Sequence, residues 1–312
     1  MTGLQLFFYV SLLVFVVGTA YKAVKIARMP LHLRWDLYPI PHEKGKGAYG
    51  GSYFEEPEWW TKPARVSILS DVREMSREVL FIQSLYHHNR KLWWFSFPFH
   101  FGLYLSIGFV VLMFAGAIVE LAGVPVDGFT GSVPARLLHY LTVPVGLAGA
   151  ALGLLGAIGL LLSRIFKYEL RATSAWSDYF NLLLIGSVFA TLMWTWATVD
   201  PWFLGSRALV GDLVAFRLPY SVPAVVYAHF LLAAVFMFWL PFTHMTHFVG
   251  KYFTYHKIRW EDHPNLRGSE LEKKVEEALG HKISWEAPHI KSGGSWAEAA
   301  ADKDQPEKQN NG

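Results

Sequence analysis

Five long apolar segments constrain this chain more than any other feature of its sequence. They run over about Leu4–Ala23, Trp93–Ala122, Pro134–Leu162, Asp178–Val199 and Pro219–Val249. Each is long enough to cross a hydrocarbon layer of about 30 Å at roughly 1.5 Å per helical residue. Within lipid only α-helices and closed barrels satisfy every backbone hydrogen bond, and runs of this length favour helices. The sequence therefore predicts an all-α integral membrane protein with five transmembrane helices.

Lys and Arg residues are concentrated on one side of these segments. The region from Lys22 to Lys91 holds 12 of them, whereas the opposite loops hold only Arg136, Arg207 and Arg217. The positive-inside rule then puts the N-terminus outside and the C-terminus in the cytoplasm. The first apolar segment lacks a basic leader and a small-residue cleavage site, so we expect it to be retained. We expect a multi-pass protein of the inner (cytoplasmic) membrane.

The sequence predicts two regions of different character. Residues 1–255 form the five-helix membrane domain, which includes a cytoplasmic loop at 25–91. Within that loop, apolar residues recur every three or four positions between Val66 and Leu85, which predicts an amphipathic helix. It would lie on the membrane surface, against a partner, or on the protein's own loops. Residues 256–312 are a polar cytoplasmic tail that we expect to dock a partner and to be disordered at its end.

The cysteine and histidine content limits the cofactors that this chain could hold. The chain has no cysteine, which excludes disulfides, thiolate iron–sulfur ligation and covalent haem attachment within it. The 13 histidines are the only abundant residues suited to hold a metal or a metal macrocycle. Redox chemistry in this chain would therefore need a bound cofactor.

The histidines inside the predicted spans are His100, His139, His229, His244 and His247. Residues 229 and 247 are 18 positions apart, which puts them on one helix face, roughly 27 Å from each other. We expect His100 at the depth of the later one and His139 at the depth of the earlier one. Two layers of two histidines would suit two b-type haems, although any single buried imidazole can simply bond a neighbouring helix. We expect His244 to be an interfacial or supporting residue.

Two stretches carry a family resemblance. The segment HFLLAAVFMFWLPFTHMTH (His229–His247) and the motif FHFG (Phe99–Gly102) resemble the gamma subunit of respiratory nitrate reductase. That family is a five-helix di-haem cytochrome b with its N-terminus outside, and the resemblance extends from the first span to about residue 247. It implies that His100 and His247 hold a cytoplasmic-side haem and that His229 is one ligand of an outer haem.

The chain departs from that family in two respects. The family has a second outer ligand ten residues after the first on the second span, where this chain has Val110. Either His139 replaces it or the outer haem is absent. The long loop and the tail are closer to related membrane subunits of sulfate-reducing prokaryotes, whose soluble partner resembles an iron–sulfur heterodisulfide reductase subunit.

These features lead us to expect a quinol-oxidising or quinone-reducing oxidoreductase subunit of a respiratory complex. It would pass electrons between menaquinol or quinone and the cytoplasmic iron–sulfur subunit through two haems b. Arg136, Tyr140 and Tyr227 are candidate donors to a quinone carbonyl, although such residues also serve as interfacial anchors. The alternatives are a transporter or channel with a histidine proton relay, and a membrane anchor without haem.

Overall fold

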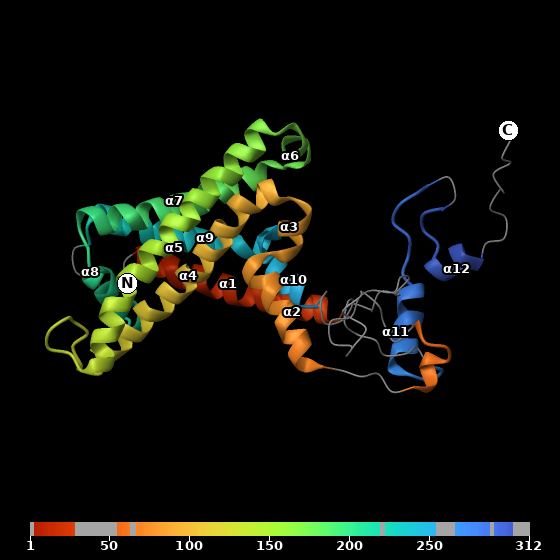
Figure 1. Cartoon of the computed structure of the whole chain (residues 1–312), viewed down its shortest axis with the longest axis horizontal. Coiled ribbons are helices and arrows are strands. Elements are labelled where there is room, and N and C mark those ends of the chain that lie inside the picture. Colours follow the sequence, from red (N-terminus) through yellow and green to blue (C-terminus); the bar gives the residue numbers. More distant parts are fainter. Residues whose placement is uncertain are drawn as a thin grey trace. The chain divides into compact units, whose positions relative to one another are not determined.

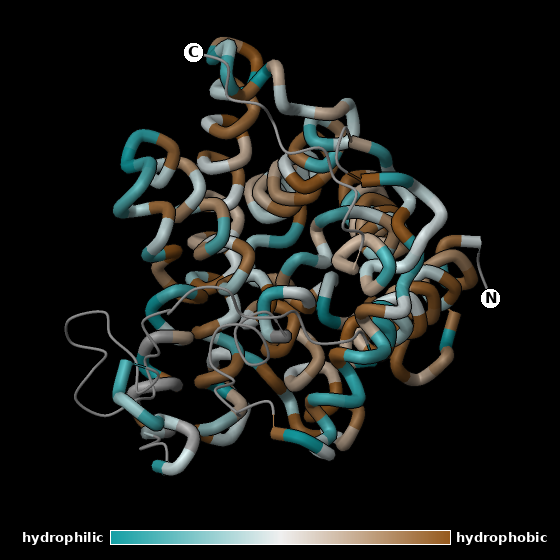
Figure 2. Tube along the Cα trace, turned by 90° about the vertical axis from the view of Figure 1, so that its right-hand side faces the viewer, coloured by the Kyte–Doolittle hydropathy of each residue, from teal (hydrophilic) through white to brown (hydrophobic). Residues whose placement is uncertain are grey.

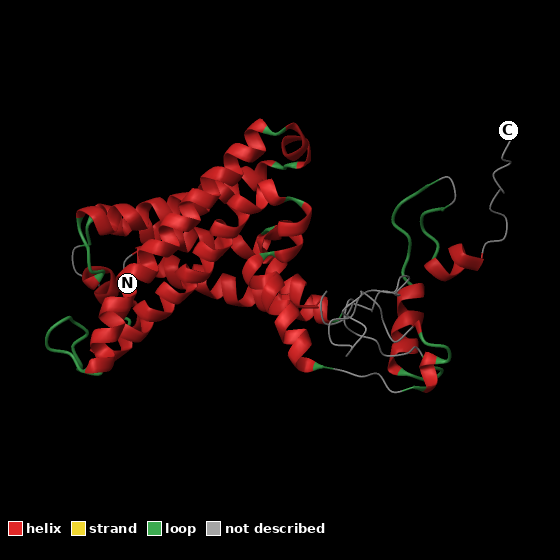
Figure 3. Ribbon diagram, in the orientation of Figure 1, coloured by secondary structure: helices red, strands yellow, loops and turns green. Residues whose placement is uncertain are grey.

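The structure is a computed structural model that describes residues 3–28, 55–62, 67–218, 222–253, 266–287 and 290–301. The chain divides into two compact units. Unit 1 comprises Met1–Ala20 and Ser76–Thr246, and unit 2 comprises Tyr21–Met75 and His247–Gly312. Within the described residues the chain is helical and has no β-strand, only two isolated bridges near the C-terminus (Figure 3).

Five helices are long and apolar enough to cross a membrane. They are α1 (Gly3–Ala27), α4 (Arg90–Leu121), α5 (Val133–Phe166), α7 (Trp176–Thr198) and α9 (Ala224–Trp239), the last extended to Phe242 by a 3-10 turn. Hydrophobic residues follow these helices along much of their length (Figure 2). The predicted all-α class and the five apolar spans are thus confirmed, and the chain has the architecture of a multi-pass membrane protein.

Small residues let α4 and α5 pack closely and antiparallel (Figure 1). A Cβ added at Gly102 would lie 2.7 Å from the carbonyl oxygen of Gly149 and closer still to the backbone of Gly153. A Cβ added at Gly156 would lie 2.6 Å from Cα of Phe99. Helices in lipid associate through such close backbone approach, because lipid offers no hydrophobic driving force. The contacts fix the register of the pair, with residue 102 level with residue 153.

The remaining helices complete the bundle of unit 1. Helix α5 packs on α7 where Gly153 meets the Phe189 ring, and α7 packs on α9. Helix α1 lies along α9, with the Phe8 and Phe230 rings 6.4 Å apart. A short helix, α8 (Leu204–Val214), packs on α4 beyond the last turn of α7. We call this side of unit 1 the α8 end, and the opposite side the α6 end after α6 (Tyr168–Thr173).

The segment before α4 contains two helices. Helix α2 (Ile68–Phe81) is followed by Ile82 with a left-handed backbone, and then by α3 (Gln83–His88). The Tyr104 hydroxyl donates to the carbonyl of Val79, and the Trp93 indole donates to the carbonyl of Phe81. The C-terminal end of α2 is therefore attached to α4.

The fifth span differs from the prediction of one helix over Pro219–Val249. Helix α9 ends at Trp239, two 3-10 turns follow, and α10 (His247–Phe253) begins afresh. Proline at 241 has no N–H for the helical ladder. The Thr243 hydroxyl then donates to the Leu240 carbonyl at 3.0 Å and accepts from the Met245 amide at 3.1 Å. These local bonds replace helical ones, and the helix breaks.

Unit 2 contains a short helix in the tail. Helix α11 (Glu270–Leu279) is capped by Ser269, whose hydroxyl accepts the Glu272 amide at 3.1 Å. A bridge between Lys282 and Ser295 leads into α12 (Trp296–Ala301). The end of the tail, expected to be disordered, lies outside the described residues.

Candidate functional site

His100 lies on α4 with its imidazole fixed by its own helix. Its Nδ1 is 2.8 Å from the carbonyl oxygen of Ser96, one turn earlier. A carbonyl can only accept, so Nδ1 carries the proton and donates. In the neutral ring the lone pair then resides on Nε2.

His229, on α9, is held in the same tautomer by a neighbouring helix. Its Nδ1 is 3.1 Å from the Thr191 hydroxyl on α7. That hydroxyl donates its single proton to the α7 backbone, with the Ser187 carbonyl at 2.8 Å. It must therefore accept from Nδ1–H, and the lone pair again resides on Nε2.

These two imidazoles fit axial ligation of a haem. A metal-ligating histidine usually donates its other N–H to a carbonyl or a similar acceptor, which fixes the ring and its tautomer. A haem needs one imidazole per occupied face, not a cage of ligands. In the part of the chain that the structure describes, no group of three or more His, Asp or Glu side chains forms such a cage.

The helix register gives the relative depth of the two rings. On the antiparallel pair α4 and α5, Gly102 meets Gly153, so His100 is level with residue 155 of α5. On α5 and α7, Gly153 meets Phe189, so residue 155 is level with residue 187 of α7. Residue 187 is four positions from Thr191, the partner of His229. The two histidines therefore differ in depth by about four residues, roughly 6 Å. The sequence predicts His100 and His229 in opposite halves of the membrane, and the register instead puts them close in depth.

His139 occupies a different environment at the α8 end. It is 6% exposed, its ring stacks on Trp202 at 5.0 Å, and its Nδ1 has no hydrogen-bond partner among the described residues. Thr191, the partner of His229, is level with residue 151 of α5 in the same register. His139 is twelve residues from residue 151 along α5, which is about 18 Å. The common depth that we expected for this pair is not seen.

His247 is the first residue of α10 and belongs to unit 2. Because α9 ends at Trp239, no continuous helix joins His229 to His247. The expected shared face of His229 and His247 assumes an unbroken helix, which the chain does not have, and stays a prediction. The pairing of His100 with His247 stays a prediction.

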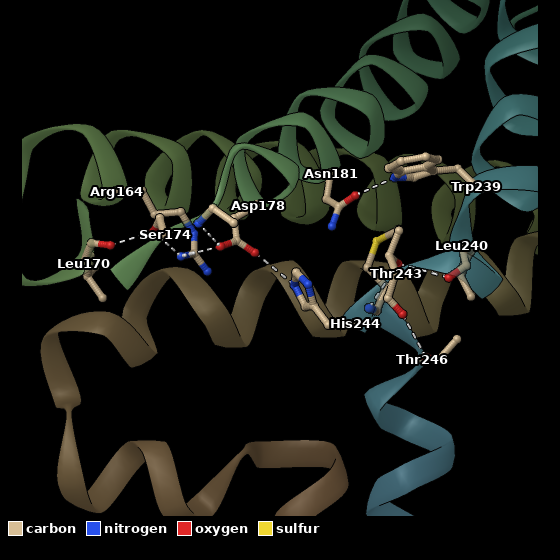
Figure 4. A network of polar contacts seen from close by, with 12 residues as sticks. Arg164, Leu170, Ser174, Asp178, Asn181, Trp239, Leu240, Thr243, His244 and Thr246 are labelled. Atoms are coloured by element: carbon tan, nitrogen blue, oxygen red, sulfur yellow. Dashed lines mark hydrogen bonds and ion pairs between the residues drawn. The ribbon is translucent and has the colours of Figure 1, made fainter. Parts of the chain in front are cut away.

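His244 contributes to a polar network at the α6 end (Figure 4). Its Nε2 is 3.1 Å from Asp178, whose other oxygen accepts the Ala175 amide and caps α7. The Arg164 guanidinium lies 3.9 Å from the same carboxylate and donates to the Ser174 hydroxyl at 2.7 Å. The network links α5, α7 and the turn after α9, where His244 is exposed. An interfacial residue is what the sequence led us to expect.

The three quinone-site candidates all lie on the surface of unit 1. Arg136 is exposed, and Tyr140 and Tyr227 are 49% and 45% exposed. The Tyr140 hydroxyl donates to the Gly128 carbonyl at 3.3 Å. The structure does not bring the three together around one buried point.

An ion pair between a buried arginine and a partly exposed glutamate, which sequence reasoning missed, lies at the α8 end. The side chain of Arg207 is 1% exposed; its Nε is 3.0 Å and its Nη2 2.9 Å from Glu120 Oε1. Nη2 also donates to the Val126 carbonyl, while Nη1 has no partner in the part of the chain that the structure describes. A Cβ at Gly116 would lie 2.7 Å from Arg207 Cδ, so glycine there makes room for the side chain. The available signal was a lone acid, Glu120, at the end of a long apolar run.

Comparisons with protein-family models, curated proteins and solved structures gave no match to this chain. The residues themselves therefore carry the functional argument.

Proposed function

We propose that this chain is a membrane b-type cytochrome subunit of a respiratory complex. The observation that carries the proposal is that His100 and His229 are both held through Nδ1. In this tautomer the lone pair of each ring is on Nε2, and the two residues lie at similar depth on α4 and α9. A haem ligand needs a lone pair on the nitrogen that faces the iron and a hydrogen bond from the other nitrogen, and this tautomer meets both needs.

In this proposal the haem supplies one-electron redox chemistry, and the protein ligates, buries and orients it. The substrate is menaquinol or another quinone in the inner membrane. The partner is a cytoplasmic iron–sulfur protein that resembles a heterodisulfide reductase subunit. With the N-terminus outside, the α8 end faces outward and the basic α6 end faces the cytoplasm. Inward electron transfer with outward proton release would then charge the membrane.

The assignment of ligands to haems remains part of the proposal. The family resemblance pairs His100 with His247 and leaves His139 as the second ligand beside His229. The similar depth of His100 and His229 favours a haem shared by these two instead. Counting haems in single variants separates the two assignments.

The test is a pyridine haemochrome assay on the purified full-length chain and on single His→Leu variants at 100, 139, 229 and 247. We expect a red protein with a b-type spectrum. A shared haem predicts that His100→Leu and His229→Leu each lose the same haem, and that their double variant loses no more. Separate haems predict additive losses. A colourless wild type with full helicity would refute the proposal and leave a transporter or an anchor.

A further inference from the structure

The buried Arg207 retains an unused hydrogen-bond donor. Glu120 occupies Nε and Nη2 of the guanidinium, and no described group accepts from Nη1. A buried donor without a partner costs about 1–3 kcal/mol, and a charged one costs more. Ionised side chains within a membrane are expensive and are usually retained for function.

A second unpartnered atom lies in the same layer. The α4–α5 register, in which Phe109 meets Gly146, puts residue 139 level with Gly116, the residue that Arg207 packs against. The Nδ1 of His139 is buried there, and no described residue forms a hydrogen bond with it. Arg207, Glu120 and Asp127 are close enough to interact electrostatically with this imidazole. Two polar atoms from two helices thus lack partners at one level of the α8 end.

The charges select the kind of ligand that would satisfy them. Glu120 already neutralises the guanidinium, so the pair has no net charge to attract a phosphate or a carboxylate. Because Nη1 can only donate, the ligand must offer an acceptor. A neutral carbonyl oxygen meets both conditions, whereas an anion would be repelled by the Glu120 carboxylate.

Aromatic side chains cover this layer. The Trp202 ring stacks on His139 and is 46% exposed, and Tyr140 meets the same indole edge-on. Flat apolar surfaces beside a few polar groups are typical of sites for planar ligands. Tyr140 is held by one long hydrogen bond to Gly128, so it can move aside at small cost.

We propose that the Arg207 layer, made of Arg207, Glu120, His139 and Trp202, binds the headgroup of a lipid-soluble quinone. A quinone carbonyl accepts from Arg207 Nη1, and the ring lies against the aromatic side chains. The choice of a quinone rests on the proposed function, but the site rests on the buried, unpartnered atoms. The proposal replaces Arg136, Tyr140 and Tyr227 as the polar contacts of the headgroup.

The test is photo-crosslinking of the full chain in lipid nanodiscs with a radiolabelled azido-naphthoquinone, followed by peptide mapping. We expect saturable labelling of residues 116–140 or 199–211 that excess menadione suppresses. Labelling confined to the α6 end, or to no defined peptide, would overturn the proposal. Suppression by an anionic phospholipid but not by menadione would also overturn it, because the site would then bind a headgroup phosphate.

Variants connect the labelling to the ion pair. In the double variant Glu120→Gln/Arg207→Gln, which removes both charges together, labelling at fixed probe should fall about fivefold, as for one lost hydrogen bond. The exposed Arg217 is the matched control, and Arg217→Gln should label like the wild type. If the double variant does not fold, His139→Phe serves instead, since it keeps the stack on Trp202 and removes Nδ1. Unchanged labelling in the folded variant would refute the site.

The same preparations separate this proposal from the proposed function. Haem content is measured on each sample before illumination. A haem-free protein that still shows menadione-sensitive labelling of the Arg207 layer would refute the cytochrome and keep the quinone site. A haem-replete protein without such labelling would refute the quinone site and keep the cytochrome.

Discussion

Replacing Gly102 with alanine tests the packing that sets the depth of His100. The added Cβ would lie 2.6 Å from Cα of Gly153 and 2.7 Å from the carbonyl oxygen of Gly149. Both are backbone atoms of α5, so no side chain can swing away, and the helices must separate. Overpacking of this kind costs about 1–3 kcal/mol, against a gain of roughly 0.5–1 kcal/mol from helix propensity. We expect a net loss of roughly 0–2.5 kcal/mol in the free energy of unfolding, with a mid-range value of about 1 kcal/mol.

Gly108, on the same helix, is the matched control. A Cβ there would meet only Cγ1 of Val145, at 3.6 Å, an ordinary contact. Gly108→Ala should therefore be neutral or stabilising by up to about 1 kcal/mol. The assay is unfolding in mixed micelles by SDS titration, followed by circular dichroism, with haem content measured in parallel. If Gly102→Ala were as stable as Gly108→Ala, the α4–α5 register and the depths derived from it would be wrong.

Two further predictions concern hydrogen bonds that the structure makes explicit. Thr191→Val removes the acceptor for Nδ1 of His229, so haem retention, measured by transfer of haem to apomyoglobin, should weaken about 10- to 100-fold. The control Thr191→Ser keeps the hydroxyl and should retain haem like the wild type. Equal retention in the two variants would contradict the tautomer assignment. At Asp127, bonds from the Thr130 hydroxyl and amide and from the Phe129 amide lower the carboxyl pKa to about 2. Because the folded pKa lies below the ordinary value of 3.8, this stabilisation is complete above about pH 4 and disappears as the pH falls toward 2. Hydrogen exchange at pH 7, corrected for intrinsic rates, should show faster exchange at residues 128–131 in Asp127→Ala than in Asp127→Asn, which keeps an acceptor oxygen; equal rates would contradict the capping role.

The five spans were predictable because apolar length is a property of the chain alone, but the break in the last span was not. Pro98 and Pro144 remain inside helices, whereas Pro241 lies in a break. All three lack an N–H, so proline alone does not distinguish them. The difference at the last one is local: the Thr243 hydroxyl bonds backbone groups on both sides of it. Counting five helical turns from His229 therefore assumed a continuous helix that ends, in the structure, at Trp239.

The histidines were identifiable from residue type, but their grouping depended on register. Depth estimated from span ends assumes helices of equal reach, whereas α4 and α5 extend well past the last turn of α7. The position of α4 relative to α7 is set by glycines of α5, with Gly153 meeting Gly102 on one side and Phe189 on the other. A sequence pattern cannot reveal which glycines meet. His100 and His229 were therefore assigned to opposite halves of the membrane.

The ion pair of Arg207 with Glu120 could not be predicted from the sequence either, because charge alone does not identify the partner. An acid at the end of an apolar run needs a cation, and three arginines were available on that side of the membrane: Arg136, Arg207 and Arg217. The choice depends on α8, which is too short to span and whose path cannot be read from apolar length. Once α8 packs on α4, Gly116 leaves the room that the Arg207 side chain occupies, and the guanidinium reaches Glu120. Arg136 and Arg217 stay exposed, so only Arg207 is placed to have a function that a surface arginine could not perform.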